Sequence, residues 1–216
     1  MEKRSIKRAT LGRLPTYLEY LRSSSESEAV SAGSIAHALG YGEVLVRRDL
    51  NLVCSEGRPK IGYPRKALIY DLETVLNVSG NIPAILVGVG KLGRALMNYR
   101  GFRQYGFSIA AGFDPDPGKQ DAENEDCPVY PMELLPDFCR EHGVSIGIIT
   151  APGSAAQQVC DLLTENGVTA IWNFAPCRLR VPKNVTMRQE NLALSLAHLV
   201  RCANEAKASC EVCDDV

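Results

Sequence analysis

Residues 87–96 read Val-Gly-Val-Gly-Lys-Leu-Gly-Arg-Ala-Leu, and this stretch decides the fold of the larger part of the chain. Its three glycines form a G-x-G-x-x-G pattern that follows the apolar run 84–87 and opens an amphipathic stretch. In a dinucleotide-binding unit, the first glycine permits a tight turn, the second lets the backbone approach a pyrophosphate, and the third lets helix and strand pack closely. The helix N-terminus adds a partial positive charge for the phosphates. The predicted phosphate-binding loop comprises Gly88, Val89, Gly90, Lys91, Leu92 and Gly93.

Apolar runs alternate with helical stretches on the C-terminal side of this loop. The continuous apolar runs are 84–87, 108–113, 145–150 and 170–174. The amphipathic stretches between them are 91–98, 132–141 and 155–166. Strands that are buried on both faces of a parallel sheet need continuous apolarity. Their alternation with helices is typical of a doubly wound α/β domain of the Rossmann type.

An acidic residue follows the second predicted strand, in the sequence Phe113-Asp114-Pro115-Asp116. Asp114 is placed to accept hydrogen bonds from an adenine-ribose diol, and its carboxylate would repel a 2′-phosphate, so NAD and NADH are favoured over NADP(H). The alternative is that Asp114 only caps a turn. Ligands of such folds bind at the carboxyl ends of the strands. The remaining predicted cofactor contacts there are Ala151, Pro152 and Asn173, beside Pro115 and Asp116.

Hydride transfer to a carbonyl usually requires a positioned acid or base, and the sequence offers none in this crevice. The three histidines, His37, His142 and His198, are expected elsewhere, and neither Tyr99 nor Lys91 forms an evident dyad. A nucleotide site without catalytic groups predicts a sensor and not an enzyme. Two alternatives stay open: a small NAD-dependent oxidoreductase with an accessory N-terminal domain, and a Rossmann domain that binds coenzyme A.

The N-terminal part predicts a winged helix-turn-helix. Helices are expected over 10–22 and 35–39, and a third begins near Glu43, after the turn Gly40-Tyr41-Gly42. The third helix should carry Val44, Val46 and Leu50 inward, and a polar hairpin loop over 55–60 follows it. A recognition helix and a basic wing suit double-stranded DNA, although a small helical domain with a solvated basic face would show the same pattern. The candidate DNA contacts are Arg47, Arg48, Arg58, Lys60, Lys7 and Arg8.

Composition agrees with a two-part, soluble chain. The net charge is only −1, but basic residues outnumber acidic ones in 1–80 and the reverse holds in 81–216. No apolar run approaches the ~18 residues needed to span a bilayer, so we expect a cytoplasmic protein without membrane contact. The eight cysteines should then be mostly free thiols. The cluster Cys202, Cys210 and Cys213 would need a fourth ligand to hold a metal, and a frayed tail is the simpler interpretation.

A last helix is expected over 187–205, with apolar residues on more than one stripe. Such a helix is better suited to pack between subunits than to cover one sheet, and a homodimer would supply two recognition helices for a palindromic operator. The predicted organisation is a winged helix-turn-helix over 1–80, a Rossmann domain over 81–184, and a dimerisation helix and tail over 185–216.

In order and spacing, several motifs of the chain resemble those of the Rex family of bacterial redox-sensing repressors. These motifs are RLPTYLEYL (13–21), VRRDL (46–50), IGY (61–63), VGVGKLGRAL (87–96), NYRGF (98–102), FDPDP (113–117), TAPGSAAQ (150–157) and NFAP (173–176). The resemblance implies a homodimer with a swapped C-terminal helix. It also implies that the protein releases DNA when NADH replaces NAD.

The sequence departs from the family at several positions. Gly42 stands where a Ser or Thr usually caps the recognition helix, and residues 52–57 replace an aromatic, glycine-rich stretch. Asn191 replaces an acid that the family pairs with residues corresponding to Arg13 or Tyr99. A neutral acceptor is generally weaker than a carboxylate, so the switch is expected to be weaker. Leu192 stands where some members place an aromatic against the nicotinamide.

Overall fold

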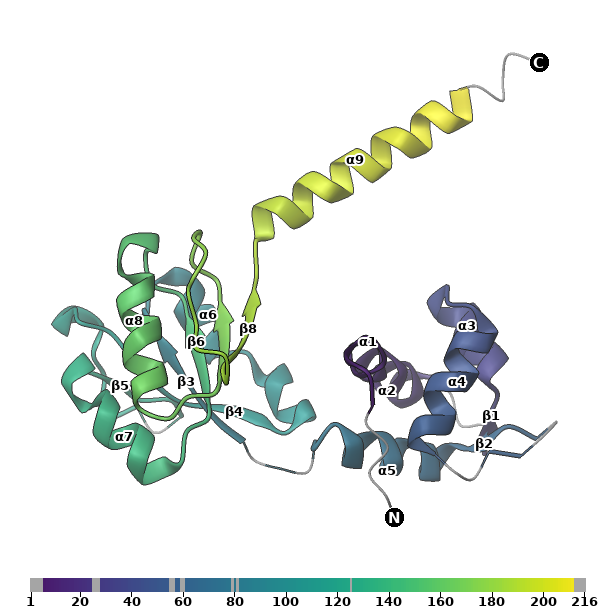
Figure 1. Ribbon diagram of the computed structural model, residues 1–216, viewed down its shortest axis with the longest axis horizontal. Coiled ribbons are helices and arrows are strands. Elements are labelled where there is room, and N and C mark those ends of the chain that lie inside the picture. The colour runs from purple at the N-terminus through teal and green to yellow at the C-terminus, as the bar shows by residue number, and fades with distance from the viewer. Residues whose placement is uncertain are drawn as a thin grey trace. The chain divides into compact units, whose positions relative to one another are not determined.

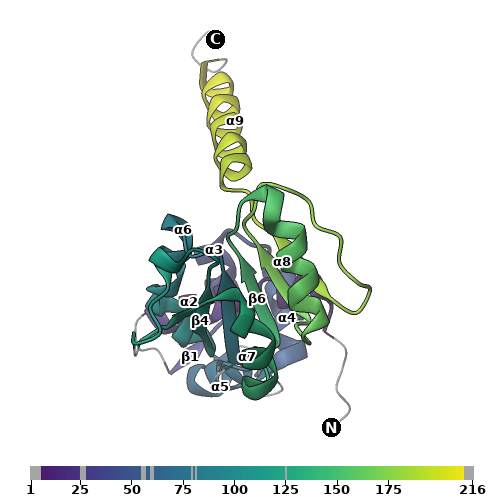
Figure 2. The same cartoon turned by 90° about the vertical axis from the view of Figure 1, so that its left-hand side faces the viewer.

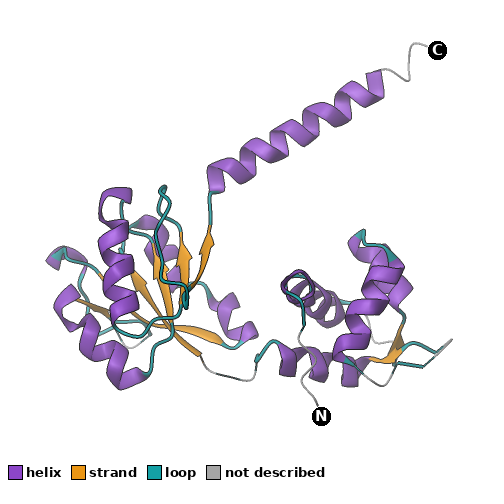
Figure 3. Ribbon diagram, viewed as in Figure 1, coloured by secondary structure: helices purple, strands orange, loops and turns teal. Residues whose placement is uncertain are grey.

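The computed structural model describes residues 6–24, 28–54, 57–58, 61–78, 80, 82–124 and 126–211, with side chains to residue 204. The chain divides into two compact units. The first comprises Met1–Asn81 with Arg100–Phe107, and the second comprises Ile82–Tyr99 with Ser108–Val216. Figure 3 shows that the first unit is mostly helical, whereas the second is built on a sheet. No helix within the described ranges is long and apolar enough to cross a membrane.

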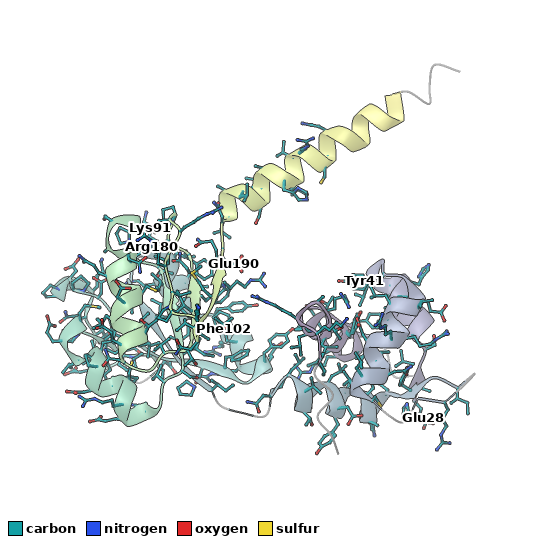
Figure 4. All side chains as sticks on the ribbon, viewed as in Figure 1. Glu28, Tyr41, Lys91, Phe102, Arg180 and Glu190 are labelled. Atoms are coloured by element: carbon teal, nitrogen blue, oxygen red, sulfur yellow. The ribbon has the colours of Figure 1, made fainter. Side chains whose placement is uncertain are left out.

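The helices of the first unit enclose a single apolar core. Their bounds are α1 Arg8–Leu11, α2 Leu14–Ser23, α3 Ala32–Leu39, α4 Glu43–Val53 and α5 Arg65–Val75 (Figure 1). Apolar residues three or four positions apart, such as Leu14, Leu18 and Leu21, are fully buried because this spacing places them on one helix face. Tyr41 packs edge-on against the buried ring of Tyr17, with ring centroids 6.0 Å apart (Figure 4).

A short two-stranded sheet completes this unit. Strand β1 (Ala29–Val30) pairs antiparallel with β2 (Tyr63–Pro64), and Arg58 bridges Gly62 within the loop before β2. Ser31 caps α3, its hydroxyl accepting a hydrogen bond from the amide of Ser34 at 2.9 Å. The arrangement confirms the predicted helical N-terminal region with a short hairpin after α4.

One inward position predicted for α4 is wrong. Val46 and Leu50 are fully buried, but 79% of Val44 is exposed. A helix turns about 100° per residue, so Val44 lies about 200° from Val46 and cannot share its face. Arg47 and Arg48 are exposed, as predicted.

The second unit is a six-stranded sheet of the order β5-β4-β3-β6-β7-β8. The strands are β3 Ile82–Val87, β4 Phe107–Phe113, β5 Val129–Tyr130, β6 Ile146–Ile149, β7 Ala170–Asn173 and β8 Thr186–Gln189. Within this unit the chain first forms the central strand β3. Strands β4 and β5 follow on one side of β3, and β6, β7 and β8 then follow on its other side. Its parallel pairs include β3–β6 and β6–β7, which confirms the predicted doubly wound sheet. The order reverses between β3 and β6, the place where such sheets bind ligands.

Helices cover both faces of this sheet. Along β3, Ile85 and Val87 pack toward one apolar core, whereas Ala84 and Leu86 belong to another. The first core is shared with α7 (Leu135–His142) and α8 (Gly153–Glu165), the second with α6 (Lys91–Met97), and Figure 2 shows α6 and α8 on opposite sides. Short 3₁₀ turns occupy Arg100–Tyr105, Pro117–Lys119 and Met132–Leu134.

The last predicted helix begins later than expected. Residues 186–189 form edge strand β8, and α9 runs over Leu192–Glu211 (Figure 1). The predicted start at residue 187 is wrong because β8 pairs with β7 from Thr186 to Gln189. Asn191 then caps α9, its Oδ1 accepting a hydrogen bond from the amide of Leu194 at 2.9 Å.

Candidate nucleotide-binding and DNA-binding sites

The glycine loop lies against the end of strand β6. Gly88 has φ +101°, and a Cβ there would come within 2.6 Å of the Ala151 amide nitrogen. Gly93 is equally constrained, because a Cβ there would lie 2.4 Å from the carbonyl oxygen of Gly88. Thr150 reinforces this contact through its hydroxyl, which donates to the Gly88 carbonyl at 2.7 Å. Two of the three glycines are thus required by the protein's own packing.

Gly90 differs from the other two glycines. Its φ of −81° is open to any residue, and nothing lies within 4 Å of the position a Cβ would take. The space beside Gly90 is therefore available to a ligand, as the second glycine of a pyrophosphate loop requires.

Asp114 lies at the end of β4 and is 3% exposed. Its Oδ2 accepts a hydrogen bond from the amide of Val89 at 2.7 Å, and its Oδ1 accepts one from the amide of Asp116 at 3.0 Å. The ammonium of Lys119 lies 3.2 Å from Oδ2. This carboxylate is therefore fixed against the glycine loop, where an adenine ribose would meet it in a dinucleotide fold.

A cavity of about 450 Å³ opens at this point, within the range of small-molecule sites. Of the predicted contacts it includes Gly88, Asp114, Pro115, Asp116, Ala151 and Pro152. Sequence reasoning missed the other lining residues, which are Val87, Lys119, Met132, Ala155, Gln158, Val159 and Leu162. Most of these are apolar, as a pocket for a flat adenine ring requires, and their helical spacing on α8 was the available signal.

The other predicted cofactor residues lie outside this cavity. Val89 is buried, Leu92 is 37% exposed, and Lys91 is exposed at the start of α6 (Figure 4). Tyr99 and Leu192 are 60% and 64% exposed.

Asn173 is fully buried, and its side chain is used inside the protein. Its Oδ1 accepts from the amide of Ala175 at 3.0 Å, and its Nδ2 donates to Gln189 Oε1 at 2.7 Å and to the Cys177 carbonyl at 3.1 Å. Beside it, the indole of Trp172 donates to Glu190 at 3.1 Å (Figure 4 labels Glu190). Asn173 therefore shapes the loop after β7.

The first unit holds the candidate DNA-binding residues. Arg47 and Arg48 are exposed on α4, and Arg58 is exposed in the wing. Arg47 forms an ion pair with Glu43 one turn earlier on the helix. Both side chains are more than half exposed, so the pair is weak and can open for a phosphate or a base. Lys7 and Arg8 are exposed at the start of α1, whereas Lys60 lies outside the described residues.

The cysteines separate into buried and exposed thiols. Cys54, Cys127, Cys139 and Cys160 are buried, and burial raises the pKa of Cys127 and Cys160 to about 11. On α9, Cys202 Sγ lies 3.7 Å from His198 Nε2. No group of three or more potential metal ligands occurs within the described residues. Cys213 and the side chain of Cys210 lie outside them.

The two units together define a class of protein in which a helical DNA-binding region is joined to a Rossmann-like nucleotide domain. Comparisons with known proteins agree with both halves. A family described as "Putative DNA-binding protein N-terminus" matches residues 5–51, and one described as "CoA binding domain" matches residues 80–177.

Sequence similarity to known proteins extends over nearly the whole chain. The redox-sensing transcriptional repressor Rex of Streptomyces coelicolor is 40% identical over 212 residues, covering 95% of this chain and 82% of the relative. The repressor of the same name from Clostridium perfringens is 33% identical and covers 94% and 97%. This chain belongs to the Rex family of redox-sensing transcriptional repressors. Because these relatives are repressors, the prediction that the protein is not an enzyme is confirmed.

Solved structures agree with this assignment. A crystal structure of RSP in complex with β-NAD⁺ and operator DNA has a TM-score of 0.86 at 29% identity, covering 99% of each chain. RSP in complex with β-NADH has a TM-score of 0.84 and covers 97% of this chain and 99% of the other. The predicted combination of a DNA-binding region with a Rossmann-like sheet is confirmed.

Proposed function

We propose that this chain represses transcription by binding double-stranded operator DNA, and that it releases the DNA when NADH replaces NAD. In this proposal residues 1–80 bind DNA, residues 81–184 hold the dinucleotide, and residues 185–216 join two copies. A repressor acts where the chromosome lies, which in bacteria is the cytoplasm.

The observation that carries the nucleotide half is the position of Asp114. Its buried carboxylate lines the same cavity as Gly88 and Ala151 and is held by the amide of Val89. An adenine ribose with a free diol can donate to this carboxylate, as NAD(H) does. The related RSP has been solved with β-NAD⁺ and with β-NADH, which supports the same ligands here.

Coenzyme A is the second candidate, because the family described as CoA binding domain matches residues 80–177. Its adenosine ribose carries a 3′-phosphate, which would approach the buried carboxylate of Asp114. The phosphate and the carboxylate are both negatively charged and would repel each other at close range, although the ammonium of Lys119 beside Asp114 reduces the repulsion. We therefore favour NAD(H), and coenzyme A belongs in the binding test as a competitor.

A homodimer is supported by the exposed apolar side chains of α9. These are Leu192, Leu194, Leu196, Leu199 and Val200, each at least 52% exposed. Contiguous apolar surface of this kind is typical of an interface. A twofold dimer would present two copies of α4 to the two halves of a palindromic site.

The decisive experiment is a mobility-shift titration. The probe is a duplex that the protein itself selects from a random-sequence library in the presence of NAD. We expect NADH to dissociate the complex at much lower concentration than NAD or coenzyme A does. Equal effects of NADH and NAD would contradict redox sensing. Replacing Arg47 and Arg48 by Ala should abolish the shift while NADH fluorescence still reports nucleotide binding.

A further inference from the structure

Asn51 and Tyr63 form a hydrogen bond between the recognition helix and the wing. Asn51 is exposed in the last turn of α4, and Tyr63 begins β2 with only 5% of its surface exposed. The tyrosine hydroxyl donates to Asn51 Oδ1 at 2.6 Å. Through this bond the buried Tyr63 orients the exposed side-chain amide of Asn51.

The tyrosine is held firmly by its surroundings. A Cβ on Gly57 would lie 2.5 Å from Tyr63 Cε1, so the wing backbone runs directly against the ring. Tyr63 also pairs with Val30 across the small sheet. Because Asn51 is hydrogen-bonded to this fixed tyrosine, its side chain should lose little conformational entropy when it binds DNA.

Asn51 shares its helix face with the candidate DNA contacts. Glu43, Arg47 and Asn51 are spaced four residues apart, so they lie on one stripe of α4. The same three residues line a pocket with a volume of about 650 Å³, together with Arg58 and Tyr63. Arg48 does not line it. The concave side of α4 is therefore the side that a base edge would enter, with the wing beside it.

The bond to Tyr63 favours one kind of base edge over another. A free asparagine recognises adenine by accepting from N6 with its oxygen and donating to N7 with its nitrogen. Here one lone pair of the oxygen accepts from Tyr63, which turns the oxygen toward the wing and leaves the two hydrogens of Nδ2 as the end of the amide that is free of this bond. In the major groove, two adjacent acceptors without a donor are the O6 and N7 of guanine.

We propose that Asn51, oriented by Tyr63, is a specificity-determining residue that recognises a guanine in each operator half-site. The proposal rests on the proposed function, because it requires α4 to bind DNA. It assigns Arg47 and Asn51 to base edges and leaves Arg48 for the phosphate backbone.

Library selection tests this proposal with the full-length protein. We expect wild type to enrich one guanine per half-site whose replacement by adenine weakens binding about tenfold, the effect of one good base contact. Asn51→Ala should reduce that penalty to less than about twofold while other positions keep their preferences. Tyr63→Phe should release the amide oxygen and shift the preference at this position toward adenine.

The outcomes separate the two proposals. An Asn51→Ala preference profile identical to that of wild type would overturn the role of Asn51, even if DNA binding persists. Failure of wild type to enrich any sequence would instead contradict the proposed function. Asn51 is exposed, so its Ala variant should fold and bind NADH normally, which keeps the test valid even if Tyr63→Phe destabilises the wing.

Discussion

Arg13 and Asp49 form an ion pair that joins the start of α2 to the middle of α4. Arg13 Nε lies 2.7 Å from Asp49 Oδ2, and Nη2 lies 2.9 Å from Oδ1. The hydroxyls of Thr10 and Tyr17 each donate to the same carboxylate at 2.9 Å. Asp49 is 1% exposed and lies two residues from both Arg47 and Asn51, so this cluster fixes the rotation of the recognition helix.

Removing the arginine should destabilise the first unit strongly. Arg13→Met leaves the buried Asp49 carboxylate without a cation, and breaking such a pair costs about 3 kcal/mol. Urea unfolding followed by circular dichroism measures this loss. The double variant Arg13→Met/Asp49→Asn should lose less than the sum of the single losses, because it leaves no uncompensated charge. Strict additivity would show that the two side chains are not coupled.

The same carboxylate predicts an acid-sensitive fold. Burial alone raises the pKa of Asp49, but hydrogen bonds from Arg13, Thr10 and Tyr17 outweigh it and lower the pKa below its ordinary value. A lowered pKa in the folded state adds stability that is fully present above the unfolded value of about 3.9 and is lost as the pH falls through the folded pKa. The free energy of unfolding should therefore fall more steeply below about pH 4 in wild type than in Asp49→Asn. Parallel pH profiles of the two proteins would contradict this role.

The glycine loop permits a matched pair of substitutions. Gly93→Ala places a methyl group against the Gly88 carbonyl, and such overpacking costs about 1–3 kcal/mol. Gly90→Ala meets only open space, so the free energy of unfolding should change by less than about 0.5 kcal/mol. The Gly90 variant should nevertheless bind NADH at least tenfold more weakly, because its methyl group occupies the pyrophosphate side. If the affinity for NADH, measured by fluorescence titration, is the same for Gly90→Ala and wild type, the pyrophosphate does not lie beside Gly90.

Asp114 and Asp116 offer a second matched comparison. Asp114→Ala removes the predicted ribose acceptor, and loss of hydrogen bonds to a charged group should weaken NADH binding about tenfold or more. Asp116→Ala should weaken binding less than Asp114→Ala does, because the Asp116 side chain also lines the cavity but is 55% exposed, whereas Asp114 is buried. Lys119→Met should lower the affinity for NADPH more than that for NADH, since it removes the cation beside Asp114, where a 2′-phosphate would lie. Isothermal titration calorimetry with both nucleotides checks all three variants.

Helix α9 predicts the oligomeric state. Leu196→Asp with Leu199→Asp places two charges on its apolar surface, where each leucine is more than 60% exposed. We expect light scattering to give a dimer for wild type and a monomer for this variant. Leu134→Asp is the control, since Leu134 is 46% exposed but lies outside α9. A dimer that survives both α9 substitutions would place the interface elsewhere.

The sequence was sufficient to predict four of the six strands of the sheet. Strands β3, β4, β6 and β7 were visible because buried parallel strands are continuously apolar, and the glycine loop located the ligand crevice. Strand β8 was mistaken for the start of a helix, because an edge strand such as Thr186–Gln189 is largely exposed and lacks an apolar run. Strand β5 was missed because two residues form no periodic pattern.

The polar side chains of the sites were harder to foresee, because they depend on contacts between distant residues. Asp49 is 36 residues from Arg13, and no local spacing links them. Family resemblance connected Arg13 with the last helix, whereas the structure shows its Nε and Nη2 bound to Asp49 within the first unit. Lys119 and Asn51 were overlooked for the same reason: only the folded chain brings them to Asp114 and Tyr63.

Helix α9 has a consequence for how such a repressor would behave in a cell. Every described side chain from residue 191 to 204 is exposed, so burial of the apolar side chains of this helix would have to come from a second molecule. If a second copy supplies it, the fraction of assembled protein depends on how many molecules a cell makes. Gene dosage would then set the occupancy of weak operators independently of the nucleotide pool, and dilution at cell division would relieve them first.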